Sequence, residues 1–432
     1  MFRALILALL TLGPWVAMAA YLPPAALHGR SVMERAQCNR CHEITDVSGL
    51  DRGIKAADRA VHCVDCHTWI LGTKGDQAAI DAQLRIFPDW ERYLDTIVHL
   101  TRLPDLGTLT RRVDPAFVRD FLDAPIDLRP HLEESMIPLR LSPAEKDAVV
   151  AYLSALNGAD GIAWGQATRA SKPAAKKIAA GRRKFIEFGC PTCHLVGNAQ
   201  LVPGFDARFY AGVGPPALLA PNLRHVGRRI PRDRLVAFIL DPVGIDPRTA
   251  MPPIPMKRDD AEAIADFLLG FSAPTRKAPT PPVDVPLLER EVLYDEVFDE
   301  ILGKICVHCH MNPARNNGEG GPGNTGGFGY AGVSLDLETY DGLERGMLRD
   351  GEWVSILEPT KSGPPILLAA LLRRHREAAR DQRPPFQDYT GDGPRISPDR
   401  PGMPLGLPAL SVSQLSLIKT WLAAGAPGPR SP

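Results

Sequence analysis

The sequence predicts an all-α protein in which short helices and loops build several domains in tandem. Pro and Gly number 42 and 38, a composition that indicates much loop and turn with short helices between. Amphipathic segments at helical spacing recur along the chain. The 432 residues are enough for two to four domains, and we expect little β-structure.

The first 20 residues predict a secretory signal peptide. Arg3 gives a positive start, residues 4–12 are apolar, and Ala17-Met18-Ala19 resembles a cleavage site. An uncleaved membrane anchor is the weaker interpretation, because the apolar run is shorter than the ~20 residues of a spanning helix. No later segment is long and apolar enough to span a membrane. We therefore expect the mature protein in the periplasm.

The charge balance argues against a nucleic-acid-binding protein. Lys plus Arg and Asp plus Glu are 50 each, so the formal net charge is zero. A nucleic-acid-binding chain would carry a basic excess or stripe. We expect no nucleic acid among the partners, and composition alone indicates no strong steering field.

All eight cysteines lie in four Cys-x-x-Cys-His motifs. Disulfides in an exported protein would explain paired cysteines, but they need no His after every second Cys. A Cys₄ zinc site also leaves the recurring His without a role. Covalent haem uses all three residues, since two thiols bond its vinyl groups and the His lies under the iron as proximal ligand. The motifs are Cys38–Cys41 with His42, Cys63–Cys66 with His67, Cys190–Cys193 with His194 and Cys306–Cys309 with His310.

At these motifs the chain resembles the class I cytochrome c family, and three domain-sized stretches carry the resemblance. It implies all-helical domains, each folded around one haem, with His and usually Met as axial ligands. We therefore expect tandem class I cytochrome c-like domains joined by Pro/Ala-rich linkers. The expected cofactors are four covalent haem c groups (heme c).

Two linkers divide the predicted mature chain. Residues 157–180 are rich in Gly, Ala and Lys, and residues 272–286 are rich in Pro, which favours a semi-rigid extended spacer. We expect a signal peptide over 1–20, a dihaem domain over 21–160 and monohaem domains over 175–272 and 287–430.

Each predicted domain ends in a Met, a short polar gap and an amphipathic helix with an aromatic-Leu pair. The aromatic residue lies 16 residues after the Met in the first two domains and 18 in the third. Capping boxes begin the first of these helices at Ser142 and the third at Ser411. The three sets are Met136 with Tyr152-Leu153, Met251 with Phe267-Leu268 and Met403 with Trp421-Leu422.

Met136, Met251 and Met403 are therefore the predicted distal ligands. A soft, neutral thioether favours ferrous iron, so His/Met ligation raises the reduction potential relative to His/His. A single Met is more often a flexible core filler. Three in register with the same helix favour ligation instead, with Met256 as the alternative in the middle domain.

The other half of the domain repeats as well. Residues 115–125 resemble 231–242, and both predict a helix that ends before Pro. Pro104-Asp105-Leu106 and Pro221-Asn222-Leu223 form a matching loop upstream of them. The third domain departs from this pattern, because it carries a Gly/Asn-rich stretch over 316–332 that we interpret as a surface loop.

One haem of the first domain lacks a Met in register. The better helix precedes Cys38, which favours Met136 for that haem, although the reverse assignment stays open. His99, on a predicted helix over 89–100, is the favoured ligand of the other iron, and His131, His28 or an open iron are alternatives. His62 and His308 lie beside or within a motif, and His225 belongs to a domain that already has its Met. His375 is the last of the seven histidines that are not predicted proximal ligands.

These features favour an electron carrier. Four haems in one chain make a relay in which the protein sets haem spacing and tunes potentials. We expect redox partner proteins as donor and acceptor, with the chain a free shuttle or a subunit of a membrane-bound respiratory complex or dehydrogenase. The alternative is a multihaem peroxidase-like enzyme with an open first-domain haem, and a haem-stapled scaffold is the weakest interpretation.

Overall fold

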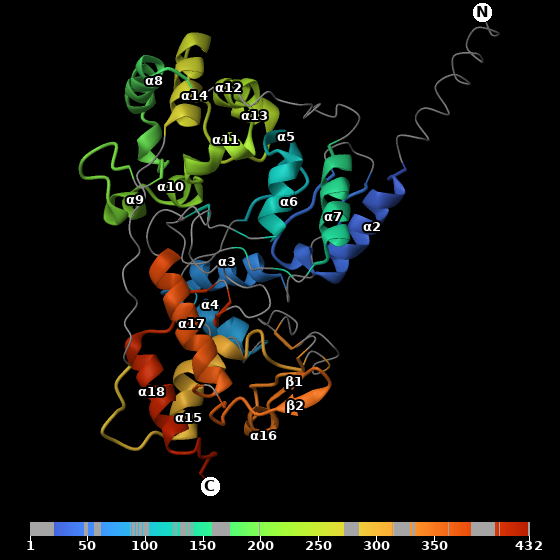
Figure 1. The fold of residues 1–432 in the computed structure, drawn as a ribbon, viewed down its shortest axis with the longest axis vertical. Coiled ribbons are helices and arrows are strands. Elements are labelled where there is room, and N and C mark those ends of the chain that lie inside the picture. Colours follow the sequence, from blue (N-terminus) through green and yellow to red (C-terminus); the bar gives the residue numbers. More distant parts are fainter. Residues whose placement is uncertain are drawn as a thin grey trace, which may run out of the picture. The chain divides into compact units, whose positions relative to one another are not determined.

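The computed structural model is mostly helical, in agreement with the predicted all-α class (Figure 1). A single two-stranded sheet occurs in the part of the chain that the structure describes. The predicted signal peptide lies outside that part. Within it, no helix has the length and apolar character needed to cross a membrane. The structure describes residues 21–46, 51–55, 62–86, 88, 91, 94, 97, 103–123, 125, 128–129, 136, 139, 141–157, 173–197, 199–271, 285–312, 314, 329–330, 333–361, 363–381, 402–405 and 407–430.

The chain forms two compact units. The Cys38 and Cys190 motifs belong to unit 1, whereas the Cys63 and Cys306 motifs belong to unit 2. Residues 21–160, predicted as one dihaem domain, are thus divided between the units, and Met136 groups with the Cys63 motif. Unit 1 is Met1–Ala56, Leu103–His131 and Pro138–Thr275, and unit 2 is Ala57–Arg102, Leu132–Ile137 and Arg276–Pro432.

Unit 1 contains two helix pairs of the same design. In each pair, a helix that precedes a cysteine motif packs against the helix predicted to follow a ligand Met. The predicted capping box at Ser142 is confirmed, since Ser142 and Glu145 each accept from the other's backbone N–H. The pairs are α2 (Pro24–Arg35) with α7 (Pro143–Ala155), and α8 (Ala175–Glu187) with α14 (Arg258–Gly270).

Both pairs cross at a glycine. A Cβ on Gly29 would lie 1.9 Å from the Ala148 carbonyl oxygen, and a Cβ on Gly181 would lie 1.9 Å from the Ala263 carbonyl oxygen. The two backbones are therefore in direct contact at each crossing. The aromatic residues of the predicted pairs, Tyr152 and Phe267, are fully buried beside these glycines.

Shorter helices complete unit 1, and they also repeat. The helices predicted over 115–125 and 231–242 are confirmed as α6 and α12, each preceded by a helical turn that ends in Arg. Apolar residues of α6 and α12 pack into the two separate cores of the helix pairs. The elements are α5 (Leu109–Arg112), α6 (Pro115–Asp123), α9 (Ala207–Val213), α10 (Pro215–Leu219), η4 (Leu223–His225), α11 (Val226–Arg229), α12 (Arg232–Leu240) and α13 (Pro242–Ile245).

Unit 2 has its largest core around Trp421, which is fully buried and donates from Nε1 to the Pro427 carbonyl at 2.9 Å. The predicted capping box at Ser411 is confirmed. A smaller core around Ile70 supports the Cys63 motif. The elements are α3 (Cys63–Thr73), α4 (Gln77–Leu84), α15 (Tyr294–Val297), the π-helix η5 (Phe298–Cys306), α16 (Tyr340–Arg345), β1 (Met347–Arg349), β2 (Glu352–Val354), α17 (Ile366–Asp381) and α18 (Val412–Ala423).

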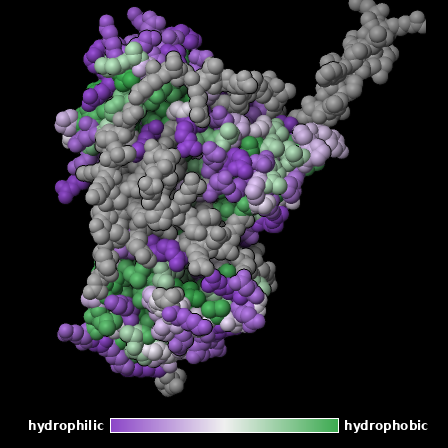
Figure 2. Space-filling model, viewed as in Figure 1, coloured by the Kyte–Doolittle hydropathy of each residue, from purple (hydrophilic) through white to green (hydrophobic). Residues whose placement is uncertain are grey.

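The described surface is mixed in polarity. On the face drawn in Figure 2, hydrophobic residues lie interspersed with hydrophilic ones. The most exposed large apolar side chains, Tyr21, Ile86 and Leu287, come from separate segments of the chain. Apolar burial in the described part is therefore concentrated in the helix-pair cores and in the core around Trp421.

We predict that Gly181→Ala destabilises unit 1 by about 1–3 kcal/mol, because the new Cβ must push α8 away from α14. Gly212→Ala is the matched control, since a Cβ at this exposed helical position meets nothing within 4 Å. Ala is favoured over Gly in helices by up to about 1 kcal/mol, so the control should not lose stability. Denaturant titration followed by circular dichroism measures both, and equal stabilities would contradict the close crossing.

Candidate haem sites

The Cys38 and Cys190 motifs share one backbone path. In each, a left-handed residue ends the preceding helix, with φ of 57° at Gln37 and 71° at Gly189. A 3-10 turn then carries the first Cys, and the motif His donates its backbone N–H to the carbonyl of that Cys. Gly suits the left-handed region, which explains Gly189. The tight turn places both thiols and the imidazole within one short segment.

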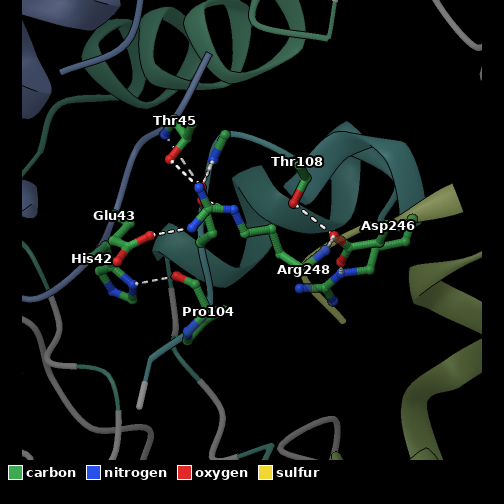
Figure 3. Close-up of polar contacts among 10 residues, drawn as sticks. His42, Glu43, Thr45, Pro104, Thr108, Asp246 and Arg248 are labelled. Atoms are coloured by element: carbon green, nitrogen blue, oxygen red, sulfur yellow. Dashed lines mark hydrogen bonds and ion pairs between the residues drawn. The ribbon is translucent and has the colours of Figure 1, made fainter. Parts of the chain in front are cut away.

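The imidazole rings of these two motifs make the same hydrogen bond. His42 Nδ1 lies 3.0 Å from the Pro104 carbonyl oxygen (Figure 3). His194 Nδ1 lies 2.9 Å from the Pro221 carbonyl oxygen. A carbonyl oxygen only accepts, so Nδ1 carries the proton and Nε2 keeps its lone pair. Histidines that bind metals are commonly oriented in this way by a second hydrogen bond. Both Nε2 atoms are therefore in the form that can ligate iron.

The residue after each Pro holds this loop in place. Asp105 and Asn222 are both buried, at 8% and 1% exposure. Each uses Oδ1 to accept one N–H from the third residue after the motif His and one from the second residue after itself. The matching loops were visible in the sequence, but this role was not. The donors are Thr45 at 3.3 Å and Gly107 at 2.7 Å for Asp105, and Gly197 at 2.9 Å and Arg224 at 3.0 Å for Asn222.

Arg229 provides a buried positive charge near His194. Its Nε has no hydrogen-bond partner, and no carboxylate pairs with it among the described residues. Burial and the charges of Arg112 and Arg129 lower the pKa of Arg229 to about 9. A buried, unpaired charge is costly, so this site suits an anionic group such as a haem propionate. Burial and the Arg229 charge also lower the pKa of His194.

Covalent attachment of a haem requires free thiols. All eight cysteines are free, and none of them forms a disulfide. Burial raises the pKa of Cys38 and Cys190 to about 11 and that of Cys66 and Cys306 to about 12. At neutral pH these four groups are therefore protonated thiols. Over the described ranges, no group of three or more His, Cys, Asp or Glu side chains is placed to hold a metal ion.

The two motifs of unit 2 have other backbone settings. Cys63 begins α3, so His67 lies within a helix, whereas Cys306 ends the π-helix η5. His308 is half-buried with a buried Nδ1, and desolvation together with the nearby His67 lowers its pKa to about 4. The two motifs thus lie near each other within unit 2.

The predicted Met ligands are all described and half-buried. Met251 lies between α13 and α14, and Met403 donates its backbone N–H to the Ala370 carbonyl of α17 at 3.1 Å. Met256, the alternative in the middle domain, packs instead against the core of α8 and α14. Ligation by Met136, Met251 and Met403 remains a prediction.

The predicted His ligand of the remaining iron, His99, lies outside the described residues, as does His131. His28 is exposed on α2 of unit 1. His62 and His375 are in the unit of the Cys63 motif. Neither ring nitrogen of buried His62 makes a hydrogen bond, and the buried Nδ1 of His375 on α17 also lacks a partner.

A polar clamp within unit 1 joins the segment before Met251 to the loop after His42 (Figure 3). Arg248 pairs with Glu43, and its Nε lies 3.4 Å from Asp105 Oδ2. Asp246, which is 2% exposed, accepts from Thr108 Oγ1 at 2.9 Å and from Arg112 Nε at 2.5 Å. Sequence spacing gave no signal for these contacts, because they join residues far apart in the chain.

No family model, curated protein or solved structure matches the chain. The interpretation of the sites therefore depends on the four motifs and on the geometry around His42 and His194.

We predict that Asn222→Ala loosens the loop under His194. The substitution leaves two backbone N–H groups without their acceptor, which costs about 1–3 kcal/mol for each buried group. Asn222→Asp is the comparison variant, because it keeps Oδ1 as the acceptor, as Asp105 does in the first repeat, and loses only the longer hydrogen bond from Nδ2 to the Gly197 carbonyl at 3.5 Å. Denaturant titration of both variants tests this, and an Ala variant as stable as the Asp variant would argue against the role.

Proposed function

We propose that the chain is a tetrahaem c-type cytochrome that carries electrons between redox partner proteins. The observation that supports this most is the paired geometry of His42 and His194, whose Nδ1 atoms donate to Pro104 and Pro221. A structural cysteine pair has no need for an oriented imidazole beside it. The same geometry in two repeats favours two equivalent metal-ligand positions.

Different residues of the chain have different roles in holding a haem. A bound haem supplies a one-electron couple at its iron. The Cys-x-x-Cys thiols anchor the ring, and the motif His presents Nε2 to the iron. The Pro carbonyl fixes the imidazole orientation, and Arg229 offers a cation to an acidic substituent. Cys38 packs against the core of one helix pair and Cys190 against that of the other.

The proposed architecture is a set of tandem class I cytochrome c-like domains. The two helix pairs of unit 1, their glycine crossings and their Pro loops support it for the Cys38 and Cys190 motifs. Residues 1–20 support export to the periplasm. The partners we propose are a donor and an acceptor protein, including a membrane-bound respiratory complex or dehydrogenase.

We predict that the exported protein carries four covalent haems. Mass spectrometry of the denatured protein should show the chain plus four haem masses. Replacing Cys190 and Cys193 together by Ser should remove one. All couples should be reversible in a potentiometric titration. A chain without covalent haem would refute the proposal, and a high-spin ferric iron that binds cyanide would favour the peroxidase-like alternative.

We predict that Met251→Leu removes a thioether ligand, whereas Met256→Leu does not. The first variant should lose the weak far-red absorption of Met-ligated ferric haem for one haem and change the potential of that haem. The second variant is the matched control, because Met256 lies five residues later in the sequence than the repeat predicts for the ligand. Loss of the band in the Met256 variant alone would make Met256 the ligand.

A further inference from the structure

We infer that the two haem sites of unit 1 are tuned in opposite directions, so that electrons pass from the haem at His42 to the haem at His194. This inference rests on the proposed function and adds a direction to the relay. It depends on three matched positions. At the first two, the His42 site carries a carboxylate where the His194 site carries a neutral side chain. At the third, both sites carry an arginine, but only the arginine of the His42 site is paired with a carboxylate.

The first matched position follows the motif His directly. It is Glu43 in the first repeat and Leu195 in the second. The second matched position follows the Pro that accepts the imidazole hydrogen bond, where Asp105 stands opposite Asn222. These two side chains accept hydrogen bonds from matching backbone groups, so they occupy equivalent places. The exchange therefore changes a buried amide into a buried carboxylate with little change in shape.

The third matched position is an arginine eight residues after the same Pro. Arg229 of the second repeat has no carboxylate partner among the described residues. Arg112 of the first repeat is paired with the buried Asp246 at 2.5 Å. A segment of the second repeat thus neutralises the arginine of the first, while its own arginine stays positive. Arg129 lies near Arg229 and adds to the positive potential there.

The positive charge of Arg248, another arginine near His42, does not reverse the difference in charge between the two sites. Arg248 faces Glu43 and Asp105, but its side chain is 44% exposed and water screens its charge. The side chains of Asp105 and Asp246 are only 5% and 3% exposed, so water screens their charges less. Around His42, the motif residue Arg40 joins Arg112 and Arg248, so three guanidinium groups balance three carboxylates, Glu43, Asp105 and Asp246. Near His194, by contrast, no described carboxylate offsets Arg229.

The sign of the effect follows from the charge of the iron. Oxidation adds one positive charge to a haem, so nearby carboxylates stabilise the ferric state and lower the reduction potential. A nearby unpaired guanidinium does the opposite. Net charge near the cofactor is a recognised determinant of its potential. The haem at His42 should therefore be reduced at a lower potential than the haem at His194, and electron transfer toward His194 should be downhill.

Charge exchange at the second matched position tests the inference in the holoprotein. Asp105→Asn should raise the lower of the two unit 1 potentials, and Asn222→Asp should lower the higher one. Each substitution also assigns the couple that it shifts most. Asp233→Asn is the control, because that carboxylate is fully exposed and should shift neither potential. The double variant Asp105→Asn with Asn222→Asp should close or reverse the gap.

Two outcomes would overturn the direction while leaving the electron-transfer proposal intact. In one, Asp105→Asn shifts the couple with the higher potential. In the other, all couples are reversible but neither exchange moves any of them. Absence of covalent haem or of reversible couples would instead refute the proposed function itself.

Discussion

The hydrogen bond from a motif imidazole to a proline carbonyl is the constraint on which the sites of unit 1 depend. It fixes the tautomer of His42 and of His194 and leaves Nε2 of each ring available. The carbonyl can accept only because the loop behind it is held by Asp105 or Asn222. The helix pairs then hold both the motif and the loop. The turn of the motif, the Pro loop and the helix crossing together therefore position one atom in each site, the Nε2 of the motif His.

Much of this arrangement could be predicted from the sequence, because its signals are local. The four motifs, the capping boxes at Ser142 and Ser411, and the helices over 115–125 and 231–242 follow from spacing and composition. The pairing of Asp246 with Arg112 could not be predicted, since the two residues are 134 positions apart in the chain. The grouping of the Cys63 motif with the Cys306 motif in unit 2 was missed for the same reason.

The two motifs of unit 2 do not share the backbone path of the Cys38 and Cys190 motifs. The Cys306 motif follows a π-helix rather than a left-handed residue, and the Cys63 motif begins a helix. Equal motifs therefore do not require equal backbone settings. A Cβ on Gly329 would lie 2.6 Å from the ring of His310, so backbone packs closely against that imidazole. The shared requirement is a confined imidazole, which the chain meets by different local means.

The glycine crossings bear on the order in which the chain can mature. Gly29 meets Ala148 and Gly181 meets Ala263, so each crossing joins the two ends of its own repeat. Closing such long loops costs conformational entropy, and contacts between distant residues form late. The cysteines follow directly after the first helix of each pair, so they are synthesised before the second helix that completes the crossing. In the cytochrome proposed above, haem attachment could therefore precede the helix crossing, which would then close over the attached group.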